Sequence, residues 1–286
     1  MRVDLILVPY DSGHRGLRMG RGPLRLLESG AAERLRAAGA EVREVTIEAR
    51  PGFGTEVGTA FELARALALA VRSARARGSF PLVLSGNCNA SVGIVAGLGA
   101  PDTGVVWLDA HGDLNTPETT ASGFLDGMAL ATLTGRCWRT LAASVDGFQP
   151  VPDERVVLVG GRDLDPPEAE LLASSRIAHV REAAVRAQGV DGALAPALER
   201  LAARAGRAYV HLDLDVHDPA EGAANHYAVA GGLSAAEVRD SLGAVARRLS
   251  LAAVALTAFD PDHDPDGRME AVALDLVAHA ASLAPG

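Results

Sequence analysis

The chain has 286 residues, of which 48% are hydrophobic and 22% charged, so it holds enough apolar material for a substantial core. Its net charge of -9 disfavours binding to the phosphate backbone of a nucleic acid. All 27 basic residues are Arg, which excludes chemistry through a Lys side chain, such as Schiff-base formation or a Walker-type phosphate site.

Short apolar runs alternate with Ala-, Leu- and Arg-rich stretches of helical periodicity along the chain. This alternation predicts an α/β fold of three layers, in which a mostly parallel sheet of about eight strands lies between helices. In chain order, the expected strands cover residues 3–8, 42–47, 81–85, 104–108, 155–159, 208–212 and 252–256. The expected helices cover residues 22–38, 57–77, 88–98, 125–134, 167–174, 192–205, 234–248 and 268–282.

The domain count and the cellular location are predicted from the linkers, apolar runs and signal patterns that the sequence could contain. No internal repeat or Pro-, Gly- or Ser-rich linker divides it, which predicts one domain over residues 1–286. Its apolar runs stop well short of the roughly 18 to 20 residues that cross a bilayer, and its first residues lack a signal-peptide pattern. We therefore expect a cytoplasmic protein with no membrane partner. Two cysteines, Cys88 and Cys137, are too few for a disulfide framework.

Two clusters of potential metal ligands follow expected strands. Asp109, His111 and Asp113 come directly after the run Gly-Val-Val-Trp-Leu, and Asp213 and Asp215 follow Tyr-Val-His-Leu. The spacing of two residues would direct each set to one side of an extended backbone. Open parallel sheets bind their ligands beyond the carboxyl ends of the strands, which is where both clusters lie.

These clusters have a structural and a chemical interpretation. The acids could be helix caps and turn formers, as Asp218-Pro219 indicates for its own position. Buried carboxylates this close would, however, repel one another unless a cation lay among them, and a chain without Lys leaves a divalent metal ion as the expected cation. Oxygen-rich sets with an imidazole suit Mn or Fe better than structural zinc, and two such strands predict two ions. Paired metals lower the pKa of a shared water and polarise the bond under attack.

The chain resembles the ureohydrolases, the family of arginase, agmatinase and formimidoylglutamase. The resemblance rests on Asp-Ala-His-Gly-Asp-Leu-Asn at 109–115, on Asp213-Leu-Asp215 with Asp218-Pro219, and on Gly231-Gly232-Leu233. The segments Val-Pro-Tyr-Asp-Ser-Gly at 8–13 and Gly-Arg-Gly-Pro at 20–23 also resemble the start of the family. The resemblance covers nearly the whole chain and implies an arginase-like fold with two Mn2+ ions. Members are often oligomers, and the sequence leaves open whether this chain forms a homo-oligomer.

The resemblance also implies individual ligand roles. Asp109 and Asp213 would bridge both ions, Asp113 would bind one of them, and His111 with Asp215 would bind the other.

Residue 88 is the first departure from the family pattern. Where the family usually has Gly-Gly-Asp-His-Ser with a ligating His, this chain has Ser-Gly-Asn-Cys-Asn at 85–89. Cys88 is predicted to ligate as a thiolate, favoured by the ions and by the start of a helix at about residue 88, and the alternative is a small buried thiol. A similar Asn-Cys signature occurs in a branch containing N-omega-hydroxy-L-arginine amidinohydrolase, which releases hydroxyurea.

Two further departures concern catalysis and substrate binding. Asp126 stands where arginases have a His that passes a proton to the leaving amine, and it is interpreted either as a general acid or as a helix N-cap. Ala258 stands where they have a Glu that holds the substrate guanidinium. The sequence leaves several possible replacements for that Glu, which are His226, Tyr227, Asp260 and Asp262.

The positions that contact the amino-acid end of the substrate in arginases look retained. By resemblance, Asn115, Thr120 and Ser122 would contact the alpha-carboxylate, and Asp163 and Asp165 lie in the region of the alpha-amino group. A small-molecule amino-acid substrate is therefore expected. The histidines outside the motifs are interpreted as structural, and they are His14, His179, His211, His217, His263 and His279. His211 is a partial exception, because it shares the face of Asp213 one layer deeper in the sheet.

The sequence thus predicts a binuclear hydrolase that attacks the amidino carbon of an arginine-like amino acid, with N-omega-hydroxy-L-arginine as a candidate substrate. Two alternatives stay open. One is a different amidine or formimidoyl substrate, which the residue at 258 permits. The other is a non-catalytic metal- or ligand-binding protein on the same scaffold.

Overall fold

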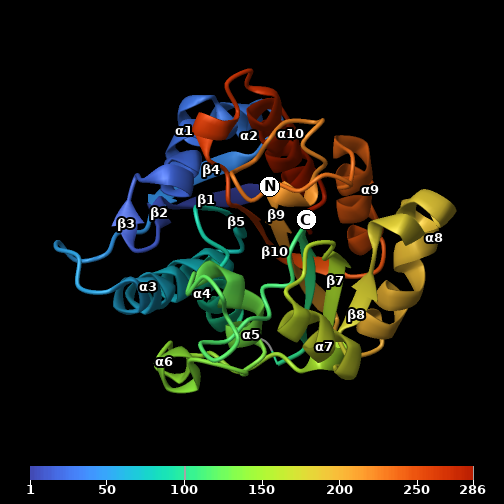
Figure 1. Ribbon diagram of the computed structural model, residues 1–286. Coiled ribbons are helices and arrows are strands. Elements are labelled where there is room, and N and C mark those ends of the chain that lie inside the picture. The colour runs from blue at the N-terminus through green and yellow to red at the C-terminus, as the bar shows by residue number, and fades with distance from the viewer. Residues whose placement is uncertain (100, 286) are drawn as a thin grey trace.

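The computed structural model describes residues 1–99 and 101–285, and a single parallel sheet forms its centre (Figure 1). Among these residues, eight strands lie in the order β4-β1-β5-β10-β9-β6-β7-β8, and every neighbouring pair is parallel. The strands are β1 (Arg2–Val8), β4 (Glu41–Thr46), β5 (Phe80–Ser85), β6 (Thr103–Asp109), β7 (Val156–Gly160), β8 (Ala178–Val180), β9 (Arg207–Asp213) and β10 (Ser250–Thr257). The predicted three-layer α/β class is confirmed.

Helices cover both faces of the sheet, with α3, α4 and α5 on one side and α1, α2, α9 and α10 on the other (Figure 1). The helices are α1 (Gly22–Glu28), α2 (Ala31–Ala37), α3 (Glu56–Ala76), α4 (Ala90–Leu98), α5 (Ala129–Leu133), α6 (Arg139–Ala143), α7 (Pro166–Ser174), α8 (Glu182–Ala202), α9 (Ala235–Ala246) and α10 (Arg268–Ser282). Short 3-10 turns include η2 (Asp126–Met128), η4 (Leu214–Val216) and η5 (Pro261–His263), and β2 (Tyr10–Asp11) pairs with β3 (His14–Arg15) in a small hairpin.

The apolar runs of the central strands are explained by burial on both faces. Along β1, Leu5 and Leu7 pack into the core under α1, α2 and α10, whereas Ile6 and Val8 pack into the core under α3 and α4. A strand covered on both sides needs apolar residues at every position, which is why these strands read as continuous apolar runs. No helix among the described residues is long and apolar enough to cross a membrane.

Several predicted boundaries are corrected. The helix expected over 22–38 is two helices, because Gly30 adopts a left-handed conformation with φ of 96° between α1 and α2. The helix expected to begin at about residue 88 begins at Ala90, so Cys88 lies in the turn before it. The helix expected over 192–205 extends from Glu182 to Ala202 and is interrupted at Gly189. The short elements α6 and β8 were missed.

The sheet order brings the strand ends that carry the predicted ligands together. β5, β10, β9 and β6 are consecutive neighbours, so residues following Ser85, Thr257, Asp213 and Asp109 leave the sheet at the same edge. β1 and β4 extend the sheet to one side of this group, and β7 and β8 extend it to the other. The strand order therefore extends in two opposite directions from this group. Open α/β sheets bind ligands at the carboxyl edge where the strand order reverses in this way.

Candidate metal centre and substrate pocket

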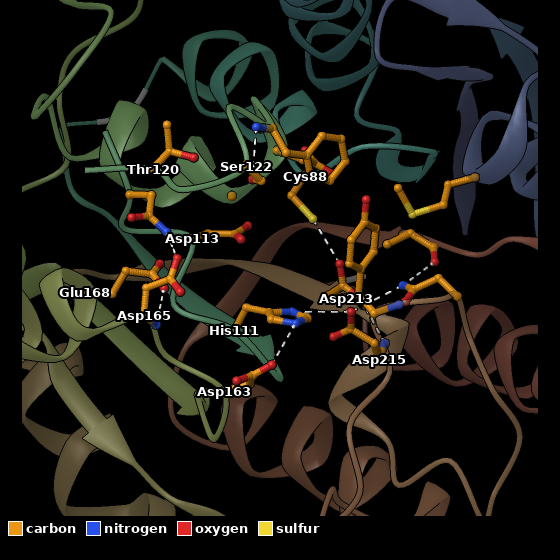
Figure 2. Close-up of a pocket in the computed structure, with 18 residues that line it drawn as sticks. Cys88, His111, Asp113, Thr120, Ser122, Asp163, Asp165, Glu168, Asp213 and Asp215 are labelled. Atoms are coloured by element: carbon orange, nitrogen blue, oxygen red, sulfur yellow. Dashed lines mark hydrogen bonds and ion pairs between the residues drawn. The ribbon is translucent and has the colours of Figure 1, made fainter. Parts of the chain in front are cut away.

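A pocket of about 280 Å³ lies at this carboxyl edge. Figure 2 shows its acidic residues facing one another across the space, with Cys88 pointing toward Asp213. The predicted site residues line it with the exception of Asp109, which is 1% exposed and contacts His111. The lining residues are Met19, Cys88, His111, Asp113, Asn115, Thr120, Ser122, Phe124, Asp126, Gly127, Asp163, Asp165, Glu168, Asp213, Asp215, Asn225, Tyr227 and Ala258.

One potential metal-binding group consists of Asp109, His111 and Asp215. The Nδ1 atom of His111 lies 3.2 Å from Asp109 Oδ1 and 3.4 Å from Asp215 Oδ2. One ligand atom from each residue lies within 4.8 Å of the other two, which is compact enough for a shared ion. The structure thus brings together a His and two carboxylates that come from β6 and β9, as the two motifs predicted.

Local turns, not continued extended strands, produce this convergence. β6 ends at Asp109 and β9 ends at Asp213, and each of these carboxylates accepts the backbone N–H two residues later, from His111 (2.8 Å) and Asp215 (2.9 Å). Asp side chains commonly form such turns. Asp113 then adopts a left-handed conformation with φ of 50°. The predicted alternation along an extended chain is therefore wrong in detail, although its consequence holds.

Cys88 lies against the other side of the cluster. Its Sγ donates to Asp213 Oδ2 at 3.0 Å and lies 3.3 Å from Thr257 Oγ1, and the side chain is buried. Cys88, Asp109 and His211 form a second group of ligand atoms within 4.8 Å of one another. Cys88 therefore lies beside Asp213, the carboxylate that the resemblance predicts to bridge both ions.

His211, the partial exception among the histidines interpreted as structural, lies close to the site. It is fully buried, its ring stacks on Trp107 with 3.5 Å between centroids, and its Nδ1 lies 2.8 Å from the Tyr209 hydroxyl. Trp107 in turn donates from Nε1 to Asp109 Oδ2 at 3.0 Å. The period-two spacing before Asp213 was the signal that pointed to His211.

The electrostatics of the cluster favour a cation among its carboxylates. Burial and neighbouring carboxylates raise the pKa values of Asp109, Asp113 and Asp213. Burial opposes the charged form of His111, but Asp215 and Asp109 outweigh it and raise its pKa to about 10. Asp113 Oδ2 is buried without a hydrogen-bond partner among the described residues. Such an atom suits a metal ligand, because native proteins rarely leave buried polar atoms unpaired. The donor set therefore fits divalent ions.

The raised pKa values predict how pH affects the metal-free protein. Asp126 has a pKa of about 8 in the folded chain, against about 3.9 for an unfolded Asp. Between these values the folded state binds more protons at Asp126 than the unfolded state, so the contribution of Asp126 to the stability of metal-free protein should fall as pH rises from about 4 to 8. Bound metal competes with these protons. We expect the difference in Tm between Mn-loaded and metal-free protein, measured by calorimetry, to widen with pH, and a constant difference would contradict this account.

Asp126 is buried and held by amide groups from the Cys88 turn. Its Oδ1 accepts from the backbone N–H (3.1 Å) and side-chain amide (3.0 Å) of Asn89, and its Oδ2 accepts from Asn87 Nδ2 at 2.9 Å. Burial is the largest cause of its raised pKa. Its side chain makes no capping hydrogen bond to η2 or α5. The N-cap interpretation is therefore wrong, and the carboxyl group faces the pocket.

The residues expected at the amino-acid end all line the pocket. Asn115 donates from Nδ2 to Asp165 Oδ2 at 2.9 Å, and Asp165 precedes the first residue of α7. Thr120 and Ser122 belong to the loop after Asn115, and both also line the pocket. Asp163 is more exposed and lies 3.9 Å from His111.

Glu168 is a pocket residue that the sequence interpretation missed. It is buried, and its carboxylate accepts from the backbone N–H groups of Leu114 (2.8 Å) and Asp165 (3.0 Å). These two hydrogen bonds connect the loop after β6 with the start of α7. The Asp-x-x-Glu spacing from 165 to 168 is a capping-box signature that could have identified it.

The structure limits which residue replaces the family Glu at Ala258. Ala258 is buried, lines the pocket and adopts a left-handed conformation with φ of 64°. Asp260 and Asp262 both pair with Arg21, and neither lines the pocket. Tyr227 does line it and stacks on Phe124, with 5.4 Å between ring centroids.

The fold and the site together define an α/β protein with a carboxylate-rich candidate metal centre at the carboxyl edge of its sheet. The chain belongs to the arginase family, whose model matches residues 1–282, and it is a hydrolase of the ureohydrolase type. It is 30% identical to the arginase of Brevibacillus brevis over 291 residues. It is 28% identical to the arginase of Bacillus caldovelox over 288 residues, and each alignment covers 96% of both chains.

Solved structures agree with this assignment. The arginase of Bacillus cereus superposes with a TM-score of 0.89 at 27% identity, and 98% of each chain is covered. The formimidoylglutamase of Bacillus subtilis has a TM-score of 0.77 at 16% identity, covering 100% of this chain and 88% of its own, which shows a likeness of fold alone. The predicted superfamily is thus confirmed, and membership of the Cys-containing branch stays a prediction.

Proposed function

We propose that the chain uses two Mn2+ ions to hydrolyse the guanidino carbon-nitrogen bond of an arginine-like amino acid, with N-omega-hydroxy-L-arginine as the preferred substrate. The products would be an amino acid with a free amine and urea or a substituted urea. The observation that carries the proposal is the group of Asp109, His111 and Asp215 beside a pocket of about 280 Å³. The arginase names of relatives that match over 96% of the chain support the guanidino class.

In this proposal, residues at and just after the ends of β6 and β9 would hold the ions. Asp109 and Asp213 would each contact both ions, and His111 with Asp215 would hold one of them. When bound, the ions would polarise the guanidino carbon and lower the pKa of a shared water. Carboxylates outnumber nitrogen and sulfur donors, which favours Mn2+ over zinc. Tight, stoichiometric zinc in the purified protein without activation by Mn2+ would overturn this choice of metal.

Cys88 and Asp113 would complete the set of ligands of the other ion. Cys88→Ala should weaken the affinity for one Mn2+ by roughly 10-fold or more, because even lost outer-shell contacts cost about 10- to 100-fold. Cys88→His should retain binding, since imidazole can donate to the same ion. Titration with Mn2+, monitored by the EPR signal of the free ion, measures both effects.

Cys137 provides the matched control for this experiment. It is also buried, but its Sγ lies 3.3 Å from Thr132 and it does not line the pocket. Cys137→Ala should leave Mn2+ affinity unchanged. Equal metal binding in the Cys88→Ala and Cys137→Ala variants would return Cys88 to the role of a buried thiol.

Asp126 would donate the proton that the leaving amine needs. Its Oδ1 accepts two hydrogen bonds and its Oδ2 only one, which leaves one lone pair of Oδ2 free to carry a proton. Burial is the largest cause that raises the pKa of Asp126, to about 8 in the metal-free chain, and it favours the protonated form that a general acid needs. The amide groups of Asn87 and Asn89 would keep the carboxyl group in place during this transfer.

Substrate selection would depend on both ends of the pocket. Asn115, Thr120, Ser122 and Asp165 would receive the alpha-carboxylate and alpha-amino groups. At the guanidino end, Ala258 would offer no carboxylate, and the stacked rings of Phe124 and Tyr227 line the same pocket. Burying a full cation without a counterion is costly, so a weakly basic hydroxyguanidine should be preferred to guanidinium.

The direct test is a turnover screen of Mn-loaded protein with guanidino, hydroxyguanidino and formimidoyl amino acids. Release of hydroxyurea from N-omega-hydroxy-L-arginine supports the proposal. Turnover of a formimidoyl compound alone would favour the alternative substrate class. Metal binding without release of urea, hydroxyurea or ammonia would favour a non-catalytic protein on the same scaffold.

A further inference from the structure

Arg162 is a nearly buried cation directly after β7, with 10% of its side chain exposed. Its Nη2 donates to the backbone carbonyls of Asp215 at 2.8 Å and His217 at 3.1 Å, and its Nη1 donates to that of Val216 at 3.2 Å. Nη2 and Nε also donate to the carbonyl of Val229 at 2.7 and 3.1 Å. A single guanidinium thus joins the turn at residues 215–217 to Val229, which lies further along the chain.

Each of these segments carries part of the site. The first is the η4 turn, which presents the Asp215 carboxylate to His111. The second is residues 218–233, here called the wall segment, because its Asn225 and Tyr227 line the pocket. Arg162 holds both segments by their backbones, so it restrains where each can present its side chains.

Asn225 connects the same two segments a second time, from inside the pocket. Its Nδ2 donates to Asp215 Oδ2 at 3.2 Å and to the carbonyl of Ala258 at 2.9 Å. Its Oδ1 accepts the backbone N–H of Tyr227 at 2.8 Å. Asp215 is therefore held at its carbonyl by Arg162 and at its carboxylate by Asn225. Arg162 also binds the wall segment at the carbonyl of Val229, and Asn225 binds it at the backbone N–H of Tyr227.

We propose that Arg162 is a positioning residue that couples the metal ligand Asp215 to the pocket wall at Tyr227. Through this coupling, Arg162 would determine both the affinity for the ion held by His111 and Asp215 and the fit of the substrate against the wall segment. The proposal rests on the metal centre proposed above. It assigns Arg162 no contact with the substrate or with the ions.

The chemistry of the side chain explains why this position needs Arg. A guanidinium presents five N–H donors in a rigid plane, enough to reach carbonyls on two segments at once, whereas an ammonium has three donors around one atom. Glu182, at the start of α8, accepts from Nη1 at 3.1 Å and neutralises the charge in this buried place. A Lys at 162 would keep the charge but could not keep this set of hydrogen bonds.

The test is the Arg162→Lys variant, compared with unaltered protein by Mn2+ titration with EPR detection of the free ion. We expect the affinity for one Mn2+ to fall about 10- to 100-fold while the other is unchanged, as for other residues that support a metal ligand. In an Asp215→Asn background, Arg162→Lys should cause no further loss, because the ion that it supports is already weakened. KM for the guanidino substrate should rise more than kcat falls.

Arg136→Lys is the matched control, since Arg136 is 21% exposed at its side chain and pairs with Asp153 at 2.9 Å away from the pocket. This variant should bind both ions as the unaltered protein does. An equal loss of affinity for both Mn2+ ions in Arg162→Lys, or no loss, would overturn the role of Arg162. Either result would leave the proposed metal centre intact. If the unaltered protein bound no ions, the metal centre itself would fail.

Discussion

Asp213→Asn is expected to remove both metal ions and to lower the turnover rate by about 1,000-fold or more, because the metals are expected to stabilise the transition state by several kcal/mol. Asp213 is 3% exposed at the end of β9, between Cys88 and the Asp215 turn. A neutral amide there would remove one of the charges that both ions share. Elemental analysis of the purified variant and a turnover assay with added Mn2+ measure the two effects.

Asp215 and Asp218, two acids close to Asp213 in the sequence, provide controls for the Asp213→Asn variant. Asp215→Ala should empty only one site, because Asp215 contacts His111 and not Cys88. Asp218→Asn should keep both ions, since Asp218 serves the turn by accepting the backbone N–H groups of Ala220 and Gly231. Retention of two ions and a normal rate in Asp213→Asn would show that the carboxylates at these strand ends are turn formers only.

N-omega-hydroxy-L-arginine is expected to be hydrolysed with a kcat/KM on the order of 10-fold or more above that of L-arginine. Ala258 lines the pocket at the position where the resemblance predicts the guanidino end, and it carries no carboxylate. Burying a guanidinium without a counterion is costly. Agmatine, which lacks the alpha-carboxylate, should lose about 10- to 100-fold against L-arginine, because unpaired groups around Asn115 and Asp165 cost about 1 to 3 kcal/mol each. Competition assays with the three compounds measure both ratios.

Ala258→Glu tests the guanidino end separately. The backbone already holds a residue with a Cβ at φ of 64°, so the variant adds a carboxylate without requiring a new backbone conformation. It should raise the relative kcat/KM for L-arginine and leave the agmatine ratio unchanged. Efficient agmatine turnover with no preference for the hydroxylated substrate would refute the substrate assignment and would leave the metal centre intact.

The ends of the helices and the shortest strand could not be predicted from the sequence pattern alone. The split of the expected helix 22–38 depends on the φ of Gly30, and an isolated glycine in a helical pattern is compatible with either a helix or a break. The strand β8 has three residues and lies at the sheet edge. A segment this short has too few residues for a period of two to be recognised.

The sequence by itself determined the fold class and which polar groups are available to the candidate site. Apolar runs separated by amphipathic helices require a parallel sheet covered on both faces. Carboxylates that directly follow two such strands must lie at its carboxyl edge, and their clustering predicts a metal ion among them.

Only the tertiary structure decided which of these groups meet. Cys88 reaches Asp213, 125 residues away, because β10 lies between β5 and β9 and brings their ends to one edge. A hydrogen-bonding pattern along one strand does not specify its neighbour in the sheet, so strand order cannot be obtained from local periodicity. The amide contacts that hold Asp126 and the carbonyls that surround Arg162 depend on that order in the same way.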